Sequence, residues 1–74
     1  MDIQEKIGIR IKELIRLKKT SQEKLAAEAG LDRTYVNSVA NGRRNISIVN
    51  LEKIAKAFNS SLKEFFASDI FKEK

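Results

Sequence analysis

Residues 22–39 read QEKLAAEAGLDRTYVNSV, and this stretch decides the fold. It contains two short helical patterns separated by only three residues, 30–32. Two helices joined so tightly must cross steeply. Gly30 permits the backbone turn between them, which other residues resist. Ala26, four residues earlier, keeps the side chain small where the helices approach each other. We therefore predict a helix, a sharp turn and a second helix here.

The remaining helices are predicted from their start signals. Asp2 with Glu5, and Ser61 with Glu64, have the spacing of capping boxes. Typical N-caps stand before the other three helices, at Ser21, Asp32 and Ser47. The sequence has no Pro and little strand-like alternation. We expect an all-α fold of five helices, at about residues 3–18, 22–29, 33–40, 48–58 and 62–68. We expect one domain over residues 1–74, with a charged tail at 72–74.

The apolar spacing predicts which side chains face inward. In the first helix Ile3, Ile7, Ile11 and Leu14 share a face, whereas Ile9 lies almost opposite. Charged residues of that helix, Arg10 among them, are expected on its other faces. The inward residues expected further along the chain are Leu25, Ala26, Ala29, Leu31, Val36, Val39, Ala40, Ile48, Leu51, Ile54, Ala55, Phe58 and Leu62.

The composition limits the classes of function that the protein can have. The 74 residues include 15 Lys and Arg against 10 Asp and Glu, giving a net charge of +5, which favours a polyanionic partner. The sequence has no Cys and no His, which excludes disulfides, Cys/His zinc sites and imidazole catalysis. We therefore expect that the protein is not an enzyme and that it binds no cofactor, metal or small-molecule ligand. No apolar run is long enough for a membrane span and no signal-peptide pattern is present, so we expect a cytoplasmic protein.

Residues 7–66 resemble a known family. The small residue at 26, the Gly four positions later and the flanking apolar residues form the helix-turn-helix pattern. The sequence resembles the lambda-repressor-like (Xre-type) DNA-binding domains. Within that family, GLDRTYVNSVANGRRNIS at residues 30–47 is similar to the controller proteins of restriction–modification systems. The resemblance implies a homodimer on a pseudo-palindromic operator in double-stranded DNA, and a regulator that activates and then represses its own and the endonuclease promoter. RNA polymerase is a further partner that it suggests.

The predicted second helix of the motif, at 33–40, supplies candidate base-reading residues. Val36 marks its buried direction, and Thr34 and Ser38 point nearly the opposite way. Arg33 lies in the first turn, and Arg is the commonest bidentate reader of guanine. The resemblance implies base reading by Arg33, Thr34, Asn37 and Ser38, and it suggests Arg44 as a further reader. Two interpretations of Tyr35 stay open, namely core packing against Val39 and contact with DNA.

Candidate phosphate contacts flank that helix. Ser21 and Gln22 stand at the start of the preceding helix, whose N–H groups favour an anion. The family uses this Gln to contact the DNA backbone and to brace the recognition helix. By resemblance Asn41 and Arg43 contact phosphates, and Asn45 lies in the same basic loop. No acid occurs between Asp32 and Glu52, so we expect a cationic surface.

The C-terminus is rich in apolar side chains. We expect Leu62 and one Phe to belong to the core, and the remainder to form a two-fold dimer interface as the family does here. The candidates are Phe65, Phe66, Ile70 and Phe71. Two other functions stay open. One is a phage-type repressor or an antitoxin with the same fold. The other is a basic amphipathic protein on anionic lipid, which leaves Gly30 and Arg33 unexplained.

Overall fold

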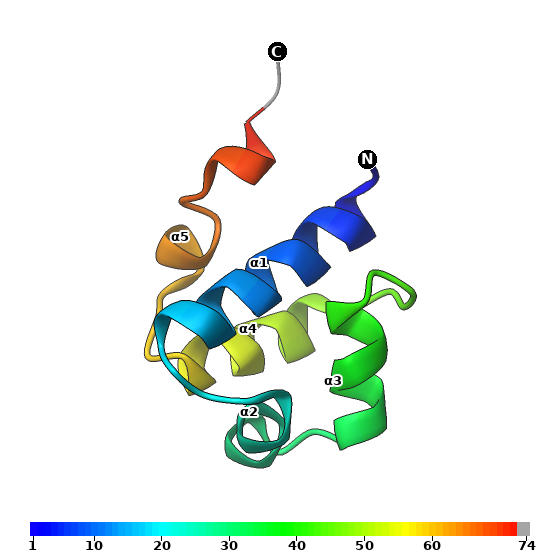
Figure 1. Ribbon diagram of the computed structural model, residues 1–74, viewed down its shortest axis with the longest axis vertical. Coiled ribbons are helices and arrows are strands. Elements are labelled where there is room, and N and C mark those ends of the chain that lie inside the picture. Colours follow the sequence, from blue (N-terminus) through cyan, green and yellow to red (C-terminus); the bar gives the residue numbers. More distant parts are fainter. Residues whose placement is uncertain (73–74) are drawn as a thin grey trace.

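The computed structural model describes residues 1–72, which form five α-helices followed by one 3-10 helix and contain no strand (Figure 1). The predicted all-α fold is therefore confirmed. The elements are α1 (Ile3–Leu17), α2 (Gln22–Ala29), α3 (Arg33–Ala40), α4 (Ile48–Ala57), α5 (Leu62–Phe65) and η1 (Asp69–Phe71). In Figure 1, α1 crosses the molecule, and α2 and α3 lie on the side away from the chain ends.

The helix starts follow the capping residues. The Asp2 carboxylate accepts the Glu5 N–H at 2.9 Å, and Glu5 accepts the Asp2 N–H at 3.2 Å. The same reciprocal pair joins Ser61 and Glu64, so both capping boxes are confirmed. Ser21, Asp32 and Ser47 each cap their helix by accepting the N–H three residues on. Local side-chain chemistry thus sets where every α-helix begins.

The last helix is shorter than expected. We predict it over residues 62–68, but α5 ends at Phe65 and the chain turns at Phe66 before η1. The physical reason is a competing cap. Ser68 has an extended backbone, and its hydroxyl accepts the Ile70 N–H at 3.4 Å, which favours a new start over continuation of α5.

Most of the expected inward residues form one core. Its fully buried large side chains are those of Ile11, Leu25, Val36, Val39, Ile54 and Phe65. The prediction is wrong for Ile3, which is 59% exposed, and for Ile48, which is 82% exposed. Each is the first residue of its helix. Ile9 is 44% exposed, as expected from its place opposite the inward stripe.

The turn at Gly30 has the predicted left-handed geometry. Its φ is 70° and its ψ is 32°, and the Leu31 N–H donates to the Ala26 carbonyl at 2.9 Å. Because residues with a Cβ adopt this conformation at a cost, the tight connection between α2 and α3 depends on glycine.

Helix α1 approaches the end of α3 at a second glycine, Gly8. A Cβ at this position would lie 2.5 Å from the Ala40 carbonyl oxygen and 2.9 Å from that of Val39. The absence of a side chain therefore allows α1 to lie directly on the C-terminal turn of α3.

Arg10 corrects a further expectation, because it is buried rather than on a solvated face. Its Nε donates to the Phe65 carbonyl at 2.6 Å and its Nη2 to the Glu64 carbonyl at 2.8 Å. Its Nη1 pairs with Glu13 on α1. One guanidinium thus joins α1 to the C-terminal end of α5.

Candidate nucleic-acid interface

Helix α3 presents a polar face beside its buried one. Val36 is fully buried, whereas Thr34 and Asn37 are exposed and Ser38 is half-buried. Thr34 therefore lies as the sequence predicts. Ser38 is less accessible than the prediction implies, because it approaches the turn after α3, where its carbonyl accepts the Arg43 N–H at 3.0 Å. The polar face is thus centred on the first half of α3.

Arg33 opens α3 and pairs with an acid of the preceding helix. Its Nη1 lies 2.7 Å from Oε2 of Glu23, and the two side chains are 69% and 73% exposed. The absence of acids between residues 32 and 52 predicts a cationic surface, but Glu23, which lies outside that range, also reaches this surface. Glu23 comes from α2, and only the crossing of the two helices brings it to this face.

A chain of amide groups joins α2 to α3. Asn41 Nδ2 donates to Asn37 Oδ1 at 3.0 Å, and Asn37 Nδ2 donates to Gln22 Oε1 at 2.9 Å. Gln22 is half-buried, and the two Asn side chains are exposed. Gln22 therefore braces α3 from the start of α2. The family resemblance implies this brace for Gln22, and the Asn37–Gln22 bond confirms it, whereas the roles of Asn37 and Asn41 in the chain of bonds are not evident from the sequence.

Tyr35 belongs partly to the core and partly to the surface. It is half-buried against the core, and its hydroxyl accepts a hydrogen bond from Asn50 Nδ2 at 3.2 Å. The Arg44 guanidinium carbon lies 5.0 Å from the centre of the Tyr35 ring. This cation–π contact holds Arg44 beside α3. Asn50, on α4, is a residue that the sequence analysis missed.

The basic loop after α3 starts at Asn41, its C-cap, and turns at Gly42 with a φ of 71°. Arg43, Arg44 and Asn45 are exposed along it. Ser21 is also exposed, and its hydroxyl caps α2 by accepting the Lys24 N–H at 3.1 Å. The candidate phosphate contacts thus lie at the N-terminal end of α2 and the C-terminal end of α3.

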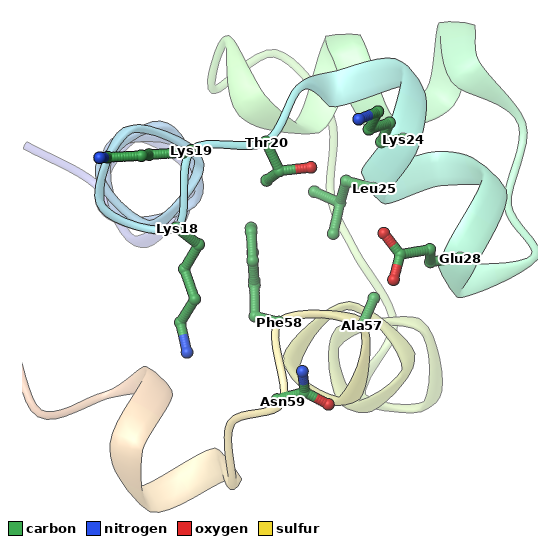
Figure 2. A pocket seen from close by; sticks show the side chains of 9 residues that line it. All are labelled: Lys18, Lys19, Thr20, Lys24, Leu25, Glu28, Ala57, Phe58 and Asn59. Carbon is green, nitrogen blue, oxygen red and sulfur yellow. The ribbon is translucent and has the colours of Figure 1, made fainter.

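A separate cleft lies between the end of α1, α2 and the end of α4, and Figure 2 shows it from close by. Its volume is about 300 Å³, and the buried Leu25 and Phe58 contribute to its lining. Lys18 and Lys19 line it as well, but Figure 2 shows their side chains extending in different directions. Convergent charges, which an anion site requires, are therefore not formed by this pair. Within residues 1–72 no cluster of acidic side chains could hold a metal ion.

The C-terminal aromatic residues divide between core and surface. Phe65 is fully buried within the chain, so the prediction that it forms a dimer interface is wrong. Leu62, expected in the core, is 39% exposed, because Phe65 rather than Leu62 turns inward from α5. Phe66 is 39% exposed, and Ile70 and Phe71 are half-buried. The Phe66 and Phe71 rings meet edge to face with centres 4.8 Å apart. We call Phe66, Ile70 and Phe71 the C-terminal apolar surface.

The steep α2–α3 crossing, the polar face of α3 and the basic loop define a DNA-binding helix-turn-helix protein. Residues 11–65 match the Helix-turn-helix family (HTH_3), and the chain belongs to this family. It is 51% identical over 74 residues to the control protein C.MunI of a Mycoplasma species, with 97% of each chain covered. It is also 50% identical over 52 residues to C.BamHI of Bacillus amyloliquefaciens, covering 68% of this chain and 64% of that one. These relatives are regulators rather than enzymes.

Solved structures show the same likeness. The restriction–modification controller protein C.AhdI from Aeromonas hydrophila superposes with a TM-score of 0.81 at 46% identity, covering 85% of this chain and 96% of that one. The C.Esp1396I tetramer in complex with its natural 35 base-pair operator gives a TM-score of 0.83 at 35% identity, covering 89% and 87%. Within the described residues, no helix is long and apolar enough to cross a membrane.

Proposed function

We propose that this chain is a sequence-specific DNA-binding transcription regulator, the controller protein of a restriction–modification system. The observation that carries the proposal is the geometry of α3, which starts with Arg33 and Thr34 exposed and is braced from α2 by Gln22. A rigid, polar helix of this kind fits the major groove. The similarity to named control proteins favours this role over a phage-type repressor or an antitoxin.

Base reading is assigned to Arg33, Thr34 and Asn37, with smaller roles for Ser38, Tyr35 and Arg44. Arg33 has the donors to recognise guanine, and Thr34 offers a hydroxyl and a methyl group to a neighbouring base. Solved variants of C.Esp1396I support this assignment. They replace an arginine, a threonine or a tyrosine at three consecutive positions, and this chain has the same residue types in the same order at 33–35.

Phosphate binding is assigned to the two helix ends beside α3. Ser21 and Gln22 offer hydroxyl and amide groups at the N-terminal end of α2, where the helix dipole favours an anion. Arg43, with Asn41 and Asn45, would hold the DNA backbone at the other end of the reading helix. These contacts fix the position on DNA and carry no sequence information themselves.

The protein acts as a homodimer in this proposal, with residues 1–74 as one DNA-binding domain in each copy. Its two reading helices would enter successive major grooves about 34 Å apart on a pseudo-palindromic site. The C-terminal apolar surface, together with Leu62, is the proposed contact between copies. The part of this aromatic pair that stays exposed is an apolar surface which burial against a second copy would remove from water.

Regulation would follow from protein concentration. A first dimer activates the promoter through RNA polymerase, and a second dimer represses it. The C.Esp1396I tetramer on its operator supports loading of two dimers on one DNA. The place of action in this proposal is the cytoplasm.

The test of base reading compares Arg33→Ala with Arg43→Ala on a duplex selected by the wild-type protein from a random library. Arg33→Ala should lose about 1–3 kcal/mol of binding free energy on that duplex and relax specificity at one base pair. Arg43→Ala should weaken binding to all sequences and lower the salt slope by about one. Equal losses on selected and scrambled DNA for Arg33→Ala would make it a phosphate contact only.

The test of dimerisation is sedimentation of Phe66→Asp. A charge on the C-terminal apolar surface should convert the dimer to a folded monomer, since the carboxylate would be buried at the contact. Leu17→Asp is the control, because Leu17 is also an exposed apolar residue (58%) but lies at the end of α1. A dimer that persists in Phe66→Asp would refute the placement.

A further inference from the structure

The polar face of α3, to which base reading is assigned, has next to it one acid that DNA binding alone does not explain. Glu23 lies in the first turn of α2, and its carboxylate binds the guanidinium of Arg33 at 2.7 Å. Both side chains are mostly exposed, at 73% and 69%. A carboxylate at a surface that approaches phosphates repels them. A reason is therefore needed for an acid at this position.

The ion pair with Glu23 leaves most of the N–H donors of the Arg33 guanidinium without a protein partner among residues 1–72. In the part of the chain that the structure describes, Nη1 is the nitrogen of Arg33 that meets a protein acceptor. A guanidinium carries five N–H donors, and bidentate recognition of guanine uses two of them. Arg33 can therefore keep its bond to Glu23 while its remaining donors face a base.

The same bond limits what Arg33 offers to a phosphate. The nearby carboxylate offsets part of the Arg33 charge, so the pair attracts the DNA backbone less than Arg33 alone would. The adjacent residue, Gln22, braces Asn37 at 2.9 Å, so the first turn of α2 is fixed against α3. Glu23 is therefore held in place relative to Arg33, because α2 and α3 are fixed against each other.

We propose that Glu23 is a specificity-determining residue, which positions Arg33 to read guanine and withholds it from phosphates. The proposal rests on the proposed function, because it concerns the same reading helix. It assigns to an acidic side chain of α2 a share in sequence recognition that the sequence analysis gives only to α3 and its flanking residues.

The experiment uses Glu23→Gln, which removes the charge and keeps the shape. Binding is measured over a series of salt concentrations on two duplexes: one selected by the wild-type protein from a random library, and a scrambled duplex of the same composition. On scrambled DNA the variant should bind about two- to fivefold more tightly, since a surface ion pair is worth up to about that factor. Its salt slope should steepen by up to about one, because Arg33 becomes free for a phosphate.

On the selected duplex the gain should be smaller or reversed, so the ratio of specific to scrambled affinity should fall. Glu28→Gln is the matched control. It removes the same charge from the same helix, but Glu28 is five residues on, about 140° around α2, and lines the separate cleft in Figure 2. In this control the affinity ratio should stay at the wild-type value.

Two results would overturn the proposal. One is an unchanged or larger affinity ratio in Glu23→Gln. The other is a fall of the ratio that persists when Arg33 is also replaced by Ala, since Glu23 would then not act through Arg33. Failure of the proposed function looks different, because the wild-type protein itself would not distinguish the selected duplex from the scrambled one. Thermal unfolding by circular dichroism shows that each variant is folded.

Discussion

Replacing Arg10 by Met tests how the C-terminal part of the chain is held. The substitution keeps a long side chain but removes the two donors that bind the Phe65 and Glu64 carbonyls at 2.6 and 2.8 Å. It also removes the ion pair with Glu13, which is partly exposed and contributes little to stability. Hydrogen bonds from a charged donor contribute about 1.5–3 kcal/mol each. Burial of the Met side chain offsets about 1–1.5 kcal/mol of that loss. The free energy of unfolding should therefore fall by about 1.5–5 kcal/mol.

The assay is urea and thermal unfolding, followed by circular dichroism. For a domain of this size, each 1 kcal/mol corresponds to about 4–8 °C in Tm, so we expect a decrease of at least about 6 °C. Lys12→Met is the control, because Lys12 lies on the same helix and is exposed. If Arg10→Met stays within about 0.5 kcal/mol of the wild type, Arg10 does not hold α5 to α1 as described.

Two other predictions concern the packing of α1 and the cap of α5. Gly8→Ala would stabilise an open helix by about 1 kcal/mol, but here the new Cβ would meet the Ala40 carbonyl at 2.5 Å, so unfolding measurements should show destabilisation by about 1–3 kcal/mol. A more stable Gly8→Ala would contradict this close approach. The hydrogen bond from the Ser61 N–H lowers the pKa of Glu64 from its ordinary value of 4.5. Its charge therefore contributes stability above about pH 4.5, which is lost as the pH falls through the lowered pKa. The wild type should have a higher Tm than Glu64→Gln at pH 7, and this difference should shrink progressively as the pH is lowered below 4.5 and the carboxylate becomes protonated. A difference independent of pH would exclude the charge as its source.

Much of the fold follows from local signals in the sequence. Each α-helix begins at its predicted cap, and α2 ends at Gly30 in the predicted left-handed turn. These features depend on residues within a few positions of each other, which a sequence displays directly. The exposed Ile3 and Ile48 show where periodicity fails. A helical repeat gives the direction of a side chain but not whether a neighbouring element reaches the helix end.

The candidate site is less predictable because its contacts join separate helices. Residues such as Arg33, Asn37 and Gln22 are identified by their type and position. Their partners are set by the α2–α3 crossing, which brings Glu23 to Arg33 across ten residues of chain. Arg10 is a similar case, since its carbonyl partners lie 54 and 55 residues further along. Nothing in the local pattern around Arg10 distinguishes it from the exposed cations of α1.

Within one turn, helix α1 contacts two parts of the molecule that are far apart in the sequence, the end of α3 and the end of α5. Gly8 allows the C-terminal end of α3 to pack directly on α1. Arg10, two residues on, hydrogen-bonds the end of α5, which leads to the C-terminal apolar surface. In a dimer formed through that surface, α1 would fix the distance between the subunit contact and the DNA major groove that α3 would enter. Such a protein would tolerate little change in the number of base pairs between the two halves of its binding site.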